Sequence, residues 1–317
     1  MPLAHLALLA LLAAPATQPA QPMRVPPQAV EALMKAIYQD RERAEPWLRT
    51  DSQSYLAAVQ REEFAGRTSL TIGRAPDSDL RIDDPLILPH HVRITVAGDS
   101  FHVVTLDDSA RFRVGGEAEP RDTTLAPTSI MLGKAGALWG RYNVRLSHQN
   151  YPAIILFDGM SQRFKEYRGL KHFPADLSYR YLLPMSPDPK MPDTLMIGST
   201  RGKGRPAQRL GWFDFMVGKK RCRLTAIHLL EPGIDSSDVA VFFRDQTNGK
   251  ETSGMGRYLQ VHGVPGTKKY LLDFNRAENP ACLYSDLYNC PLPPRENTLR
   301  VPILAGEKDL HYLSAKK

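Results

Sequence analysis

Hydrophobic residues occur along most of this chain in short β-branched runs that are broken by Gly, Pro or Asp. Between residues 67 and 147 the runs include "SLTIGR", "HVRITV", "SFHVVTL" and "YNVRL". Short strands at this spacing, with turn residues between them, are typical of a small sandwich or barrel. We therefore predict a small β-sandwich over residues 67–147.

A second β-rich region follows, beginning with the apolar run Pro152–Phe157. The stretch from Leu210 to Leu230 predicts a hairpin that turns at Gly218 and Lys219. No alternation of strands and helices and no internal repeat occurs. Residues 148–317 are therefore predicted to form a larger C-terminal β domain, either a barrel or a sandwich.

Residues 17–66 differ from the rest, because a Pro-rich spacer leads into a helical pattern. Apolar residues at Val30, Leu33, Met34 and Ile37 follow the spacing of an amphipathic helix, and Pro46 is expected to end it. A second helix is predicted in "DSQSYLAAVQREEF". These helices either bind a partner or cover a sheet edge, and the second is the simpler interpretation. The predicted fold class is mainly β, with N-terminal helices.

The first residues of the chain carry no Lys, Arg, Asp or Glu, and residues 3–14 are apolar apart from one His. This run is shorter than the about 20 residues that a membrane span needs. It is typical of a signal peptide, with a cleavage site at Ala14-Pro15-Ala16. We predict a signal peptide over residues 1–16, a periplasmic or secreted protein, and no transmembrane segment after signal removal.

The formal net charge is +7, which favours an anionic ligand. The charge is scattered, however, and the densest cluster, "RGKGRPAQR" (201–209), contains the Gly and Pro of an exposed loop rather than a phosphate-binding patch. We therefore predict a ligand that is anionic and of unknown identity, and no binding of nucleic acid.

Cys282 and Cys290 lie in a proline-rich stretch near the C-terminus. In an oxidising compartment such a pair tends to form a disulfide, and closing the loop would contribute about 2–3 kcal/mol. A metal clamp or a nucleophile is the alternative, but no C-x2-C or H-E-x-x-H motif is present. The prediction is a disulfide, with Cys222 as a buried thiol, and neither a metal nor a cofactor.

Polar residues gather at strand ends in the C-terminal region. Arg244 and Asp245 follow an apolar run, and Arg257 presents donors that suit a carboxylate or a phosphate. If Leu271–Asn275 is a strand, Asp273 and Asn275 point to the same side. Each of these residues either holds a turn or a polar network together or contacts a ligand.

The full set of candidates for a ligand site or a polar network is Arg244, Asp245, Arg257, Asp273, Asn275, Arg276, Asn279, Asn297 and Glu307. The favoured function is that of an exported ligand-binding or structural protein. The alternative is a hydrolase or lyase that uses an Asp/Arg/Asn/Glu cluster, with Glu307 as a general base if burial raises its pKa. Mutual pairing without a pocket would favour the first hypothesis.

The stretch "LTIGRAPDSDLRIDDPLILPHHVRIT" resembles the forkhead-associated family, which binds phosphothreonine peptides on a β-sandwich. Gly73, Arg74 and His91 match the family pattern, whereas Leu88 replaces its serine, and no Asn-Gly turn follows "SFHVVTL". The two missing positions would hold phosphate and peptide backbone. The resemblance therefore implies the sandwich without the ligand.

The C-terminal region resembles a bacterial family known as domain of unknown function 1684. The resemblance is carried by "FKEYRGLKHFPAD", "VFFRDQTNGKETSGMGRYLQV" and "LDFNRAENPACLYSDLYNCPLPPRENTLRVPILAGEK". It implies a family with no established reaction, so it defines a class of protein but not a chemistry.

Overall fold

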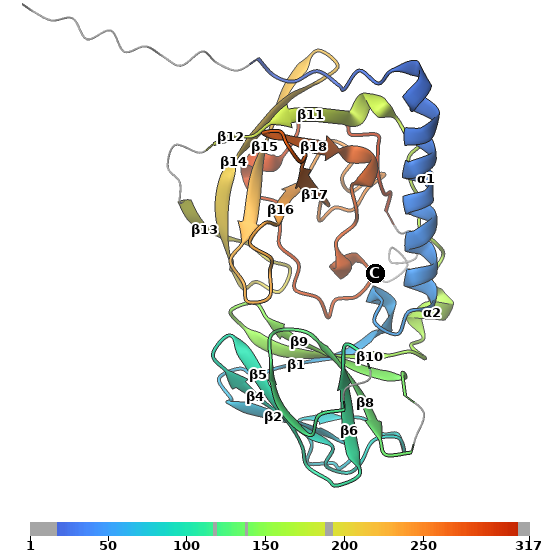
Figure 1. Cartoon of the computed structure of the whole chain (residues 1–317), viewed down its shortest axis with the longest axis vertical. Coiled ribbons are helices and arrows are strands. Elements are labelled where there is room, and N and C mark those ends of the chain that lie inside the picture. Colours follow the sequence, from blue (N-terminus) through green and yellow to red (C-terminus); the bar gives the residue numbers. More distant parts are fainter. Residues whose placement is uncertain (1–17, 117–118, 137–138, 188–192, 310–317) are drawn as a thin grey trace, which may run out of the picture.

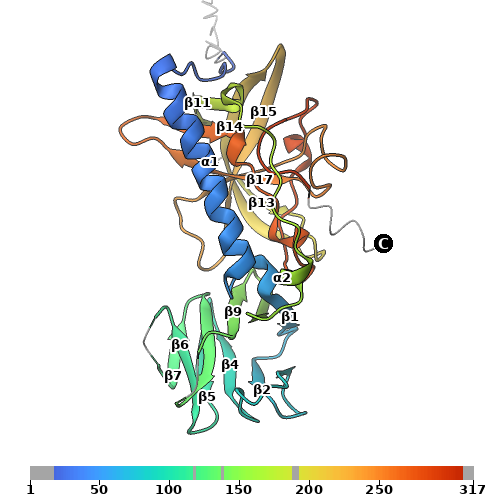
Figure 2. The same cartoon turned by 90° about the vertical axis from the view of Figure 1, so that its right-hand side faces the viewer.

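The computed structural model describes residues 18–116, 119–136, 139–187 and 193–309. The expected signal peptide, residues 1–16, lies outside them. The described chain forms two β parts, one above the other, and helix α1 (Pro27–Thr50) runs along one side of the C-terminal part and ends near the sandwich (Figures 1 and 2). The predicted fold class, mainly β with helix at the N-terminus, is confirmed.

Helix α1 is confirmed, but the prediction that Pro46 ends it is wrong. Proline removes only one N–H bond of the helix, and one more turn follows it. The Thr50 hydroxyl donates to the carbonyl of Pro46 at 2.9 Å, and Leu48 is buried. These local contacts and the burial of Leu48 offset the missing bond.

The predicted second helix is also wrong. Its sequence forms a single 3-10 turn, η1 (Tyr55–Ala57), and then strand β1 (Ala58–Glu63), which pairs antiparallel with β10 (Pro152–Asp158). A partner strand almost 100 residues away in the sequence satisfies the backbone of this segment. Local periodicity carries no information about such a partner.

The sandwich consists of two five-stranded sheets, ordered β3-β2-β4-β5-β7 and β1-β10-β9-β8-β6. Their remaining strands are β2 (Ser69–Gly73), β3 (Leu80–Arg81), β4 (Val92–Ala97), β5 (Ser100–Thr105), β6 (Ala110–Val114), β7 (Asp122–Leu125), β8 (Ser129–Lys134) and β9 (Tyr142–His148). The two inner faces enclose one apolar core. The second sheet extends beyond the predicted range to include β1 and β10.

Strand β10 is apolar along most of its length because both of its faces are covered. Ile154 and Leu156 belong to the core of the sandwich. Ile155 and Phe157 point the other way and pack with Tyr288 and others from the C-terminal part. This strand therefore forms the junction between the two β parts.

The C-terminal part is built on an eight-stranded sheet with the order β11-β18-β17-β16-β15-β14-β12, and β13 pairs with β14. Its elements are α2 (Arg163–Glu166), η2 (Leu177–Tyr179), β11 (Arg180–Pro184), β12 (Ser186–Pro187), β13 (Asp193–Ile197), β14 (Arg205–Val217), β15 (Lys220–Leu229), β16 (Val239–Phe243), β17 (Arg257–Gly263) and β18 (Lys269–Asp273). The predicted hairpin is confirmed as β14 and β15, with Gly218 in the left-handed region at φ 57°.

After β18 the chain crosses the sheet as irregular backbone with three 3-10 turns, η3 (Phe274–Arg276), η4 (Ala281–Leu283) and η5 (Arg295–Asn297). This segment is drawn in orange and red in Figure 1. Its apolar residues Leu299, Val301 and Ile303 complete the core of the C-terminal part. Among the described residues, no helix is long and apolar enough to cross a membrane.

Candidate functional site

Asp245 and Arg257, two of the residues singled out from the sequence, form a fully buried ion pair. Their side chains are 1% and 0% exposed, and Arg257 Nη2 donates to Asp245 Oδ2 at 2.8 Å. Arg257 also donates to the carbonyls of Ile303 and Ala305. Asp245 accepts from the N–H and hydroxyl of Thr247. The pair holds the irregular segment against the sheet.

Asp273 and Asn275 form a second network. Asp273 accepts from Arg180 and from both nitrogens of Asn275. The Asn275 side-chain amide also accepts from the N–H of Asp176 and donates to the Asp176 carbonyl, at 2.8 Å each. Both side chains are buried, so they are committed to structure.

Asn297, Arg244 and Arg276 do not belong to either of these networks. Asn297 is fully buried and bonds the backbone of Thr225 and Phe242. Arg276 pairs with Asp40 of α1. The backbone of Arg244 bonds Asn297 and Leu299, which brings that strand end against η5.

Asn279 and Glu307 come together at the end of the irregular segment. The backbone N–H of Asn279 donates to Glu307 Oε2 at 2.8 Å. Burial raises the pKa of Glu307 to about 8, and Glu278 adds to the rise. Gly306 has φ 79°, and a Cβ there would lie 2.6 Å from the carbonyl of Ala277. The glycine of the "AGEK" signature is therefore a steric requirement.

The predicted disulfide is not formed, because Cys222, Cys282 and Cys290 are all free thiols. Cys282 and Cys290 are nevertheless neighbours: the Cys282 N–H donates to Cys290 Sγ at 3.0 Å. The hydrogen bond to Cys290 and burial raise the pKa of the Cys282 thiol. Burial opposes ionisation of Cys290, but the bonds from Cys282 outweigh it and lower the Cys290 pKa.

A cavity lined by residues of both β parts lies at their junction, and we call it the interdomain pocket. It has a volume of about 210 Å³ and receives Arg61, Arg145 and Ser147 from the sandwich. Its other wall comes from the C-terminal part, and includes Tyr258, Glu278, Tyr288 and Cys290. It adjoins a more open cleft of about 520 Å³, and the two share Arg145, Ser147, Gln149 and Arg205.

Strand β9 explains how polar groups reach this pocket. Its inward residues, which belong to the core of the sandwich, are Tyr142, Val144 and Leu146. Its outward residues, on the opposite face, are Asn143, Arg145 and Ser147. The alternation in "YNVRLSH" thus places a row of polar side chains toward the C-terminal part.

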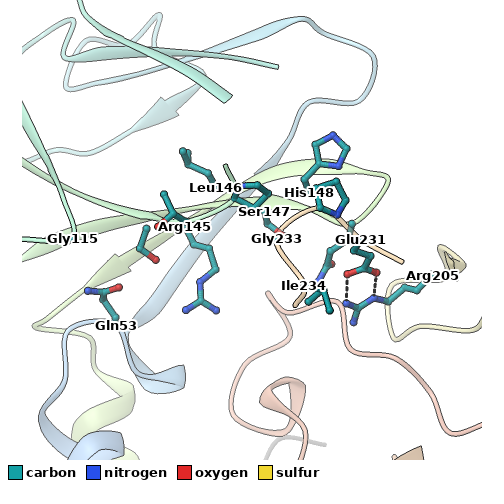
Figure 3. A pocket seen from close by; sticks show the side chains of 15 residues that line it. Gln53, Gly115, Arg145, Leu146, Ser147, His148, Arg205, Glu231, Gly233 and Ile234 are labelled. Atoms are coloured by element: carbon teal, nitrogen blue, oxygen red, sulfur yellow. Dashed lines mark hydrogen bonds and ion pairs between the residues drawn. The ribbon is translucent and has the colours of Figure 1, made fainter. Parts of the chain in front are cut away.

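Arg145 is the principal cation of the pocket. Its side chain extends into the open cleft, on the side of Gln53, while Arg205 lies beyond it in a bidentate pair with Glu231 (Figure 3). Among the described residues, the Arg145 guanidinium has no hydrogen-bond or ion-pair partner; it lies over the Phe157 ring at 5.4 Å from the ring centroid. Arg61, by contrast, bonds Glu63 and the carbonyl of Leu287.

Sequence reasoning did not select Arg145 or Glu278. The signal for Arg145 was a single charged residue on the polar face of a strand whose other face is core. Glu278 stands next to the selected Asn279. Neither signal distinguishes a pocket residue from an ordinary surface charge without knowing that the two β parts meet there.

The loop "RGKGRPAQR" was expected to be solvated, but part of it bridges the two β parts. Lys203 and Arg201 both pair with Glu63 of β1. Lys203 also lies over the ring of Tyr151 at 4.7 Å. These pairs close one side of the junction.

The sandwich keeps the loop scaffold expected from the forkhead-associated resemblance. His91 is buried, and its Nδ1 accepts from the N–H of Leu88 at 3.2 Å. Burial lowers the His91 pKa. A Cβ on Gly73 would lie 2.0 Å from the carbonyl of Pro89. Leu88 itself offers no hydroxyl to a phosphate, so the geometry of the loop is kept while one ligand donor is missing.

Comparisons with known proteins agree with both resemblances. Residues 165–308 match the model of a family described as "Protein of unknown function (DUF1684)", and residues 70–129 match the FHA domain model. The sandwich is thus similar to the forkhead-associated domain, and the C-terminal part is similar to that uncharacterised family. The interdomain pocket lies where the two meet.

One solved structure that resembles the chain is the solution NMR structure of an uncharacterized protein of Haloarcula marismortui. The identity is 28%, the match covers 45% of this chain and 78% of that one, and the TM-score is 0.37. None of the curated proteins matches the chain.

Proposed function

We propose that this protein binds a small anionic ligand in the interdomain pocket. The observation that carries the proposal is Arg145, a half-buried guanidinium that lines both the pocket and the adjoining cleft. Within the described part of the chain it has neither an ion-pair nor a hydrogen-bond partner. Because guanidinium presents a planar fork of donors, its natural complement is a carboxylate or a phosphate.

Further groups support the same ligand chemistry. Ser147, Gln149 and Tyr55 line the pocket and offer hydroxyl and amide donors. The volume of about 210 Å³ is smaller than the roughly 300–1,000 Å³ of pockets for drug-sized molecules. The ligand we propose is therefore a small molecule rather than a polymer.

We favour ligand binding over a hydrolase or lyase. The enzyme hypothesis depended on polar residues that are already paired: Asp245 bonds Arg257, and Asp273 accepts from Asn275 in a second buried network. Glu307 has the raised pKa of a general base, but its carboxylate bonds the backbone of Asn279, and it lines a smaller adjoining cavity of about 110 Å³ rather than the interdomain pocket.

Isothermal titration calorimetry at low ionic strength tests the proposal, with phosphate, sulfate and acetate as probes. We expect Arg145→Gln to weaken binding by at least about tenfold, because a hydrogen bond to a charged group contributes about 1.5–3 kcal/mol. The matched control is Arg93→Gln, which removes an exposed arginine of β4 that lines neither cavity. Equal binding by the Arg145 variant, or no binding by the wild type, would refute the proposal.

We also propose that the protein is exported, which the apolar segment at residues 3–14 supports. Expression of the full chain in a bacterium, followed by fractionation and intact-mass analysis, tests this. Export predicts a periplasmic product that begins at Thr17. A cytoplasmic product that retains the N-terminal segment would contradict it.

A further inference from the structure

Glu278 places a second uncompensated charge in the interdomain pocket. Its backbone pairs with Tyr258 of β17, and each N–H donates to the other residue's carbonyl at 2.9 Å. This pairing fixes the position of Glu278 on the pocket wall. In the part of the chain that the structure describes, its carboxylate has no hydrogen-bond or ion-pair partner.

Arg41 and Arg276 line the same small cavity as Glu278, but among the described residues neither forms an ion pair with its carboxylate. Loss of water around the carboxylate raises the pKa of Glu278, and the charge of Arg276 opposes this rise, while part of the residue stays exposed to solvent. Its neighbours along the adjoining cavity of about 110 Å³ are Asp40 and Arg41 from α1, with His172 and Glu307. Asp40 and Arg276 already pair with each other.

Tyr55 lies within the field of both charges of the pocket. Burial and, to a lesser extent, the charge of Glu278 raise the pKa of Tyr55 to about 12, while the charge of Arg145 opposes this rise. The rings of Tyr55 and Tyr288 pack against each other with centroids 5.6 Å apart. The pocket thus has a cation from the sandwich, an anion from the C-terminal part, and an aromatic surface that contacts both regions.

We propose that the ligand is a small amino-carboxylate, whose carboxylate pairs with Arg145 and whose ammonium pairs with Glu278. This inference rests on the anion site of the proposed function. The aliphatic carbons of the ligand would contact the rings of Tyr55 and Tyr288. A ligand of this kind compensates both charges at once, which neither a simple anion nor a simple amine can do. The space of about 210 Å³ equals roughly seven water volumes, which suits a molecule of amino-acid size.

The experiment measures dissociation constants of wild-type protein at pH 7 for a chain-length series: glycine, β-alanine, 4-aminobutyrate and 6-aminohexanoate. Each is compared with its N-acetyl derivative and with the alkyl carboxylate of the same length. We expect at least one amino-carboxylate to bind about three- to tenfold more tightly than its two comparison compounds. This comparison needs no variant, so it does not depend on the folding of a mutant.

Glu278→Gln should remove the advantage of the amine and leave binding of the alkyl carboxylate unchanged, whereas Arg145→Gln should weaken both. Glu31→Gln, an exposed position on α1, is the matched control and should change nothing. The amino-carboxylate inference fails if the amine does not tighten binding of the carboxylate, or if butylamine binds as tightly as the amino-carboxylates. In either case the effect of Arg145→Gln on carboxylate binding still tests the anion site. If no carboxylate, phosphate or sulfate binds, both proposals fail.

Discussion

Replacing Asp245 by Ala should destabilise the protein strongly without acting through the interdomain pocket. The carboxylate is 1% exposed and is the ion-pair partner of Arg257, which is 0% exposed. After the change, Arg257 keeps its carbonyl acceptors at Ile303 and Ala305. It loses its counter-charge, and the Thr247 N–H loses its acceptor.

The expected cost follows from burial of the charge that remains. Removing one partner of a fully buried ion pair typically costs about 3–5 kcal/mol. For a domain of this size, each kcal/mol lowers the melting temperature by about 2–4 °C. We therefore expect a decrease of roughly 6–20 °C, measured by circular dichroism during thermal unfolding.

Asp193→Ala serves as the matched control for Asp245→Ala. Asp193 pairs with Arg209 at 2.6 Å, but the two side chains are 31% and 24% exposed. An exposed pair contributes only about 0–1 kcal/mol, so this variant should melt close to the wild type. The double variant Asp245→Leu/Arg257→Met should recover part of the lost stability, because it removes the isolated charge. A melting temperature for Asp245→Ala within about 2 °C of the wild type would refute the reasoning.

Three further predictions concern the irregular C-terminal segment. Because the pKa of Glu307 is raised to about 8 from about 4.3 in the unfolded chain, the folded state binds more protons between these values, and its stability should fall as pH rises toward 8. Glu307→Gln should flatten this fall between pH 6.5 and 8.5 in urea unfolding. Burial lowers the pKa of His172 to about 4, so this residue changes the pH dependence of stability only below about pH 6.5. If Glu307→Gln leaves the slope of stability against pH unchanged, the assignment of the slope to Glu307 is wrong. Asn297→Ala should cost about 2–4 kcal/mol in urea unfolding, because it leaves backbone groups of Thr225 and Phe242 without partners; a cost below 1 kcal/mol would show that the segment adjusts. Alkylation of denatured, unreduced protein should add three labels, since all three cysteines are free; a single label would reveal a bridge between Cys282 and Cys290.

Much of the fold could be predicted from the sequence, because local patterns carry it. Short β-branched runs such as "HVRITV" and "SFHVVTL", separated by turn residues, predicted the strands of the sandwich. The hairpin at Gly218 followed from a glycine between two apolar strands. Spacing and turn residues act over a few positions, so a reader of the sequence has all the information that such elements need.

The residues that lie at strand ends were also found from the sequence, but their roles were not. Asp245 and Arg257 pair with each other, and Asp273 pairs with Asn275 and Arg180. Whether a polar side chain bonds a neighbour or a ligand depends on which segments cross above it. The path of the irregular segment decides this, and no periodic pattern specifies that path.

By itself, the sequence determined the mainly β class, the two families that the chain resembles, and the hairpin that turns at Gly218. Tertiary structure alone decided that β1 would be a strand, that α1 would continue past Pro46, and that Arg145 and Glu278 would line one pocket with no ion-pair partner among the described residues. The physical reason is range: strand alternation and turn geometry are properties of neighbouring residues, whereas burial and pairing of charges depend on contacts between segments far apart in the chain.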